Sequence, residues 1–235
     1  MDEFEQNGIL EEGIEGISGL HVKPYLSYYS VVEQLIGSNS SVLEIGAGTG
    51  RHTGVIAQTG ARVTALDISD LSLQVLRMRT SGKVDTLCAS MDSVPVADSS
   101  FDFIVSAGAL SYADFEKAWK EIKRLLKPGE SLIVLDTLNH NPVYRINRFL
   151  HFLMGRRTFL TLRRMPKMAQ INRMRAKFFY STLSTFGELY WIQVILKYFV
   201  GFERVNKAIA VVENTAPSKW GFKFLLVAKD FQPKI

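Results

Sequence analysis

Short apolar runs alternate with amphipathic stretches along much of the chain. The apolar runs lie at 41–45, 62–67, 84–89, 101–107 and 131–135, and the amphipathic stretches at 24–37, 52–58, 69–80 and 114–126. Short buried runs are typical of parallel strands, and apolar stripes with a period of 3.6 residues are typical of helices packed on a sheet. The alternation therefore predicts an α/β fold with a parallel sheet and a ligand site at the carboxyl ends of its strands.

The chain beyond residue 137 has a different pattern. Residues 202–212 and 220–229 alternate between apolar and polar positions, which predicts two antiparallel strands joined by a turn containing Pro217. Between 139 and 200, apolar residues are interleaved with arginines, which predicts basic amphipathic helices. We therefore divide the chain into an acidic lead with a first helix (1–38), a ligand-binding core (39–138), a basic helical insertion (139–200) and a closing hairpin (201–235).

A glycine-rich turn follows the first predicted strand. Glu44, Gly46, Gly48 and Gly50 form the spacing E-x-G-x-G-x-G. Glycines here let a bulky ligand approach the backbone, and the helix that follows offers unpaired N–H groups to an anion. A dinucleotide site needs G-x-G-x-x-G and a P-loop ends in Gly-Lys-Ser/Thr, and neither is present. An ordinary strand-to-helix turn is the alternative that this spacing alone leaves open.

A carboxylate at the end of the second predicted strand supports a ligand site. Asp67 lies 21 positions after Gly46. In a βαβ unit, an acid at this distance lies beside the first turn, where its two oxygens accept hydrogen bonds from both hydroxyls of a ribose. Asp67 could instead cap the next helix, but Ser69 and Asp70 are better placed for that role.

These two motifs resemble those of the class I S-adenosylmethionine (SAM) dependent methyltransferases. Residues 90–102 are similar to the D-x-x-x-L-P-F-x-x-x-S-F-D pattern of that family, and the resemblance extends over about residues 43–136. It implies a Rossmann-like, seven-stranded, mostly parallel sheet of order 3-2-1-4-5-7-6, with helices on both faces and a helical insertion before the last two strands. It also implies SAM as cofactor, S-adenosylhomocysteine (SAH) as product, and no metal.

The resemblance implies that the glycine loop holds the amino-acid end of the cofactor. Gly46, Ala47 and Gly48 are expected to hold the methionine portion. Glu44 is expected to fix the loop and to assist the amino group. Asp67 is expected to hold the ribose.

The adenine is expected between Ile68 and Met91. The family acid that meets the adenine amino group falls on Ser90 in this chain, which is a departure from the pattern. Either Ser90 makes a neutral hydrogen bond to the base, or Asp92 reaches in from two positions further along.

Other candidates come from the first helix and the end of the fourth strand. Tyr25, with Tyr29 in reserve, is the candidate for the methionine end, although both rings could equally be core residues. Gly108 is expected near the sulfonium, and Ser106 is expected among the cofactor-binding residues. Tyr112 is expected to line the acceptor pocket.

The composition agrees with a globular domain of ordinary size. Of 235 residues, 47% are hydrophobic, and a single cysteine, Cys88, excludes a disulfide framework. Six acidic residues precede the first basic one, Lys23, which is the opposite of a signal peptide and favours a cytoplasmic location. No apolar run, including 189–202, reaches the roughly 20 residues of a spanning helix.

Positive charge is concentrated in one segment. Residues 137–187 contain ten Lys or Arg and no Asp or Glu, whereas the whole chain has a net charge of +5. This segment favours a phosphate-bearing acceptor or peripheral contact with the anionic inner membrane face. Nucleic acid would suit the charge, but no stacking platform or binding module is evident. A solvated helical cap is the remaining alternative.

The chemistry expected of the protein is alignment of an acceptor and, for a hydroxyl, removal of its proton. His140, just after the fifth strand, is the candidate base, although a loop histidine without a catalytic part is the alternative.

Residues 139–158 and 162–166 also resemble methyltransferases of bacterial surface-polysaccharide clusters, which implies O-methylation. The sequence thus predicts a SAM-dependent methyltransferase acting on an anionic small-molecule, sugar or carrier-linked acceptor. An RNA methyltransferase and a non-catalytic SAM-binding scaffold are the alternatives.

Overall fold

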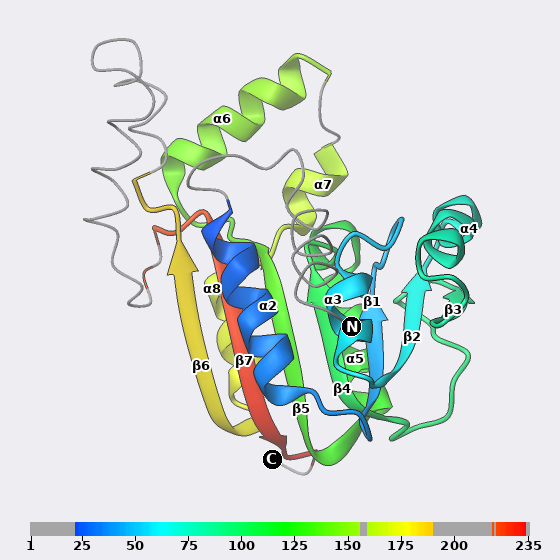
Figure 1. Ribbon diagram of the computed structural model, residues 1–235. Coiled ribbons are helices and arrows are strands. Elements are labelled where there is room, and N and C mark those ends of the chain that lie inside the picture. Colours follow the sequence, from blue (N-terminus) through cyan, green and yellow to red (C-terminus); the bar gives the residue numbers. More distant parts are fainter. Residues whose placement is uncertain (1–21, 156–158, 190–217, 219, 234–235) are drawn as a thin grey trace.

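The computed structural model describes residues 22–155, 159–189, 218 and 220–233, and it contains one seven-stranded sheet (Figure 1). The strand order is β3-β2-β1-β4-β5-β7-β6, which confirms the order predicted from the sequence. The first five strands are parallel, and β7 runs antiparallel to both of its neighbours. The strands are β1 Ser41–Ile45, β2 Arg62–Asp67, β3 Asp85–Cys88, β4 Phe101–Ala107, β5 Leu126–Thr137, β6 Phe178–Phe186 and β7 Lys223–Phe231.

Helices cover both faces of this sheet. In Figure 1, α2 and α3 lie in front of the sheet, and α5 and α8 lie behind it. The helices α6 and α7 lie over the carboxyl edge of the parallel strands, in the upper part of the view. The helices are α2 Lys23–Leu35, α3 Thr53–Gln58, α4 Asp70–Arg79, the 3₁₀ helix η2 Leu110–Tyr112, α5 Phe115–Leu125, α6 Pro142–Leu153, α7 Phe159–Arg164 and α8 Met168–Arg175.

The two-residue period of the strands divides the core into two layers. In β1, Val42 packs on the side of α2 and α3, whereas Leu43 and Ile45 pack on the side of α5 and α8. All three side chains are buried, as expected for an inner parallel strand covered on both faces. The polar groups of a ligand site are therefore expected at the strand ends, where helices no longer cover both faces of the sheet.

The sixth strand is not where the sequence analysis placed it. The expected strand at 202–212 lies outside the described residues, and the position beside β7 is occupied by β6, within the segment assigned to a helical insertion. Residues 178–186 read F-F-Y-S-T-L-S-T-F, a run of aromatic and β-branched residues that favours a strand. The prediction failed because the charge pattern of the preceding helices was extended past Lys177.

The helices α6, α7 and α8 lie between β5 and β6, where basic helices were expected. Asn141 begins α6 as its N-cap, accepting a hydrogen bond from the Val143 N–H (2.9 Å), and Pro142 occupies the first helical position. Across the described ranges, no helix is both long and apolar enough to span a membrane.

Candidate functional site

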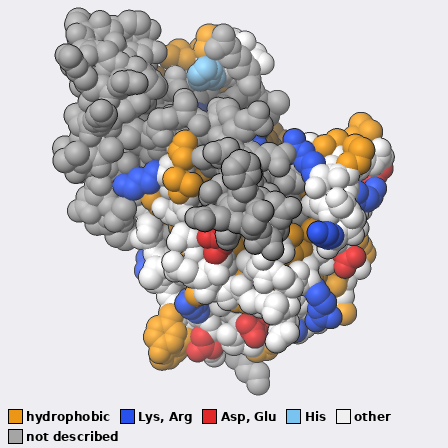
Figure 2. All heavy atoms as spheres, viewed as in Figure 1, with side chains coloured by type: hydrophobic (Ala, Val, Ile, Leu, Met, Phe, Trp, Pro, Cys, Tyr) orange, Lys and Arg blue, Asp and Glu red, His pale blue; other side chains and the backbone are white. Residues whose placement is uncertain are grey.

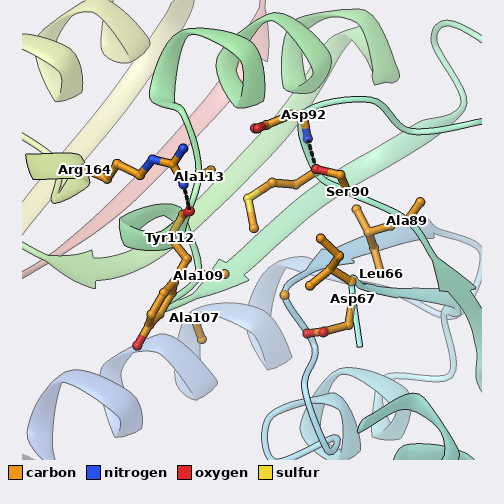
Figure 3. Close-up of a pocket in the computed structure, with 14 residues that line it drawn as sticks. Leu66, Asp67, Ala89, Ser90, Asp92, Ala107, Ala109, Tyr112, Ala113 and Arg164 are labelled. Atoms are coloured by element: carbon orange, nitrogen blue, oxygen red, sulfur yellow. Dashed lines mark hydrogen bonds between the residues drawn. The ribbon is translucent and has the colours of Figure 1, made fainter. Parts of the chain in front are cut away.

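A pocket of about 440 Å³ opens at the carboxyl edge of the sheet, where β1, β2, β3 and β4 end (Figure 3). Tyr112 and Arg164 lie on one side of it, and Asp67, Ser90 and Asp92 on the other. Eight residues predicted from the sequence line this pocket: Gly46, Asp67, Ile68, Ser90, Met91, Asp92, Gly108 and Tyr112.

The glycine loop is tightly packed against the strand ends. Gly46 has a φ of +72°, and a Cβ at this position would lie 2.1 Å from the Cβ of Ala109. The N–H groups of Gly46 and Ala47 both donate to the carbonyl of Leu66, at 2.8 and 3.0 Å. Since L side chains rarely adopt such a φ and none fits the space, the loop needs glycine at 46.

Asp67 fixes the loop from the end of β2. Its Oδ2 accepts a hydrogen bond from the Gly48 N–H at 2.8 Å, and its Oδ1 accepts one from the Ser69 N–H at 2.9 Å. A carboxylate has about four lone-pair sites, so each oxygen keeps capacity for a ligand donor. Ser69 is the residue that caps α4, through its bond from Ser72 N–H, as the sequence predicted.

A buried acceptor atom lies at the opposite wall of the pocket. Asp92 Oδ1 is buried and has no hydrogen-bond partner among the described residues. The Asp92 N–H donates to Ser90 Oγ at 3.2 Å, so the two candidates for the base-reading role form one turn. A buried carboxylate oxygen without a donor is costly, and a ligand amino group would satisfy it.

Glu44 is buried beneath the glycine loop rather than in the pocket wall. Thr53 Oγ1 donates to its Oε2 at 2.6 Å, which ties β1 to the start of α3. Burial raises the pKa of Glu44 to about 7, and the nearby charge of Asp67 adds to this, although the hydrogen bond from Thr53 acts in the opposite direction. From this position Glu44 ties β1 to α3 beneath the loop, and its part in holding the cofactor stays a prediction.

Tyr25 and Tyr29 pack on His52 instead of lining the pocket. The rings of Tyr25 and His52 are stacked with centroids 5.3 Å apart, and a hydrogen bond of 2.7 Å joins Tyr29 Oη and His52 Nδ1. Lys223, at the start of β7, donates to Tyr25 Oη at 3.1 Å. The sequence analysis gave no role to His52 or Lys223, since residues so far apart in the chain carry no common local signal.

Two further predicted residues lie away from the pocket wall. Ser106 is buried, and its Oγ donates to the Ile45 carbonyl at 3.2 Å, so it joins β4 to β1. His140 is exposed on the connection between β5 and α6 and does not line the pocket. Neither side chain therefore lies in the pocket wall, where Ser106 was expected to bind the cofactor and His140 to act on the acceptor.

Tyr112 and Arg164 form the open side of the pocket. Tyr112 is 66% exposed, and its backbone carbonyl accepts a hydrogen bond from Arg164 Nη1 at 2.8 Å. Arg164 comes from α7 and was not predicted at the pocket. In the part of the chain that the structure describes, no group of three or more His, Cys, Asp or Glu side chains could hold a metal ion.

Glu44 and His52 should give the protein opposing dependences on pH. The folded pKa of Glu44 is raised from 4.5 to about 7, so the folded state binds more protons and the free energy of unfolding falls as pH rises through this window. Glu44→Gln does not have this dependence on pH. We therefore expect its free energy of unfolding to rise by about 3 kcal/mol relative to that of the wild type between pH 4.5 and 7. Urea unfolding at several pH values measures it.

His52 contributes with the opposite sign. Burial, with the charges of Arg51 and Lys223, lowers its pKa from 6.5 to about 4, so the unfolded state binds more protons and stability rises with pH. The difference for His52→Asn should therefore fall by about 3 kcal/mol between pH 4 and 6.5. Differences that stay constant with pH in both variants would contradict these pKa directions.

Known proteins resemble the core of this chain. Residues 43–134 match the family model described as a methyltransferase domain. Malonyl-[acyl-carrier protein] O-methyltransferase from Buchnera aphidicola is 33% identical over 132 residues, covering 51% of this chain and 52% of that protein. Demethylmenaquinone methyltransferase from Clavibacter sepedonicus is 34% identical over 98 residues, covering 40% of each chain. The matches thus span about half or less of these curated relatives.

The fold is similar to solved methyltransferase structures over most of its length. Geranyl diphosphate C-methyltransferase from Streptomyces coelicolor superposes with a TM-score of 0.61 at 14% identity, covering 90% of this chain and 81% of that one. This likeness concerns the fold. Together, the matched family model and the strand order identify residues 43–134 as the core of a class I SAM-dependent methyltransferase domain, and SAM is the cofactor of that family.

Proposed function

We propose that the protein transfers a methyl group from SAM to a small-molecule or carrier-linked anionic acceptor, with O-methylation favoured. The observation that carries this proposal is the pairing of the glycine loop with Asp67 at the mouth of an open pocket. SAM supplies an activated methyl group when bound. The contribution of the chain is to hold the cofactor, exclude water and orient the acceptor.

The residues around the pocket fit an adenosyl group with an amino-acid tail. The free lone pairs of Asp67 would accept the two ribose hydroxyls, and Ile68 and Met91 would enclose the adenine. Asp92 Oδ1, buried and without a donor among the described residues, suits the adenine amino group, with Ser90 as the alternative. The loop around Gly46 would receive the amino-acid tail.

The acceptor side would be formed by Tyr112, Arg164 and the basic helices α6 to α8. The named relatives act on malonyl-[acyl-carrier protein], demethylmenaquinone and geranyl diphosphate, which supports a small or carrier-linked acceptor here. Cations on these helices support an acceptor with negative charge. A sugar in polysaccharide biosynthesis, and peripheral contact with an anionic membrane, agree with the same charge pattern.

His140 remains our candidate for the general base. Because it is exposed at the edge of α6, it would act on an acceptor that extends out of the pocket toward the helices. We expect His140→Ala to lower turnover by about 10² to 10⁴-fold, the usual contribution of a general base, while the affinity for SAH stays normal. Unchanged turnover in this variant removes His140 from the mechanism. His151→Ala, on α6, is the matched control.

Transfer of a labelled methyl group tests the function directly. Full-length protein is incubated with radiolabelled SAM and, separately, with sugar-nucleotide, lipid and RNA pools. We expect label in the sugar-nucleotide or lipid pool. Label in RNA favours an RNA methyltransferase. SAH binding without label in any pool favours a non-catalytic SAM-binding scaffold.

A further inference from the structure

Three hollows follow one another along α7 and its C-terminal end. Arg164 lines both the cofactor pocket and a second hollow beside the start of α5. Arg163 and Lys167 line this second hollow and also a third one of about 520 Å³, between α6 and α7. We call the third one the α6–α7 hollow. Shared lining residues therefore connect it to the place where the methyl donor is proposed to lie.

The α6–α7 hollow is strongly basic. Four of its lining residues are cations and none is acidic: Arg145, Arg148, Arg163 and Lys167. Arg145, Arg163 and Lys167 are exposed, and none of the carboxylates that the structure describes forms an ion pair with them. Cations gathered without a counter-charge repel one another, so an anion bound there would stabilise the arrangement.

Arg148 makes the base of the hollow rigid. Its side chain is only 4% exposed, and Nη1 donates to the Leu138 carbonyl at 3.1 Å. Its guanidinium also lies over the ring of Phe222, 5.2 Å from the centroid. A buried guanidinium held by backbone and ring contacts supplies positive potential that does not depend on a flexible surface side chain.

The other wall of the hollow is apolar and open to solvent. Ile146, Phe149 and Phe159 are 62%, 50% and 63% exposed. Phe152 connects the two rings, with centroids 6.0 Å from Phe149 and 6.0 Å from Phe159, so α6 and α7 share one aromatic surface. Figure 2 shows hydrophobic side chains at the surface at the top of the molecule, where Figure 1 places α6. A ligand that covers this surface removes apolar area from water, which favours binding.

The acidic residues of the second hollow, beside the start of α5, already have partners. Asp114 caps α5 by accepting a hydrogen bond from the Glu116 N–H at 3.0 Å, and Glu116 forms an ion pair with Arg173. An extended anionic ligand passing along α7 would therefore meet Arg163, Arg164 and Lys167 with their positive charge largely available.

We propose that the α6–α7 hollow binds the phosphate or diphosphate of an amphiphilic acceptor. Arg145, Arg163 and Lys167 hold the anion, and the apolar tail covers Phe149, Phe159 and Ile146. The methyl-accepting end extends along α7 toward Tyr112. This inference rests on the proposed function, because it names the acceptor class of the same site. A nucleic acid would use the cations and leave the apolar wall exposed, so the wall favours the amphiphile.

Calorimetry with three probes tests the proposal on the full chain saturated with SAH. The probes are farnesyl diphosphate, inorganic diphosphate and farnesol. Because the hollow joins cations to an apolar wall, farnesyl diphosphate should bind at least about tenfold more tightly than either of the others. The double variant Arg145→Glu/Arg163→Glu should weaken this binding by about 100-fold, which is a typical loss for two charge-assisted contacts. Phe149→Ser/Phe159→Ser should reduce it to the level of inorganic diphosphate.

Lys83→Glu is the matched control for charge reversal, since Lys83 is exposed in the turn before β3, outside the three hollows. It should bind farnesyl diphosphate like the wild type. Equal affinity for farnesyl diphosphate in the wild type and the arginine double variant overturns the proposal. Vesicles of anionic phosphatidylglycerol are a further probe, and binding of the protein to these vesicles alone also overturns the proposal. Each variant is also titrated with SAH. If the wild type does not bind SAH, the proposed function itself is refuted. If the wild type binds SAH but does not bind farnesyl diphosphate, only this inference is refuted.

Discussion

Replacing Gly46 with alanine should abolish SAH binding and destabilise the protein by roughly 3 kcal/mol. The φ of +72° costs an L residue about 1–2 kcal/mol, and a Cβ lying 2.1 Å from the Ala109 Cβ adds an overpacking cost of about 1–3 kcal/mol. The loop can relieve this overlap only by moving away from Ala109, which breaks the hydrogen bonds of Gly46 and Ala47 to Leu66. Isothermal calorimetry with SAH and urea unfolding measure the two effects.

Gly82→Ala is the matched control for this substitution. Gly82 has nearly the same φ, +71°, but no atom lies within 4 Å of the Cβ that alanine would add. It should lose only about 1–2 kcal/mol of stability and keep its affinity for SAH. Similar losses of SAH binding in both variants would show that backbone conformation, and not the close approach to Ala109, is what matters.

Asp67→Ala should weaken SAH binding by about 100-fold or more. The substitution removes both oxygens proposed for the ribose, and each charge-assisted hydrogen bond contributes about 1.5–3 kcal/mol. It also removes the acceptors that hold the Gly48 and Ser69 N–H groups. Calorimetry measures the dissociation constant for SAH, and urea unfolding separately measures the stability lost with these two hydrogen bonds.

Asp85→Ala removes the same charge from the neighbouring strand at its opposite end. Asp85 begins β3 and is exposed, whereas Asp67 ends β2 at the pocket. Its affinity for SAH should stay within about twofold of wild type. If Asp67→Ala binds SAH as tightly as Asp85→Ala, the Asp67 carboxylate only stabilises the glycine loop and does not bind the ribose.

The sequence allowed the core of the fold to be predicted because its signals are local. The apolar runs that form β1, β2 and β4 are each followed by a turn or a helix with its own periodicity, so order and direction follow from chain connectivity. The same holds for the pocket, since Gly46 and Asp67 stand at strand ends that parallel pairing brings to one edge.

Other features depend on contacts between distant segments. β6 was missed because no Gly or Pro separates α8 from residues 178–186. The strand pattern of these residues was therefore assigned to the helical segment before it. Lys223 meets Tyr25 across 198 positions, and Arg164 reaches Tyr112 across 52. No periodicity in the sequence encodes such pairs. They follow only from the packing of α2 and α7 against the finished sheet.

Ser106 illustrates a different limit. Its position at the end of β4 was predicted correctly, but the two-residue period of the strand turns its hydroxyl toward Ile45 instead of into the pocket. A prediction of strand ends identifies the right edge of the sheet, and the pleat then decides which side chains face the ligand.

Titration of the folded full-length chain with SAH tests the central claim most directly, because SAH contains the whole adenosyl group and amino-acid tail without the reactive methyl group. We predict one binding site per chain, with affinity clearly higher for SAH than for adenosine alone. No heat with either SAM or SAH, from protein that unfolds cooperatively in urea, would contradict the assignment of this pocket.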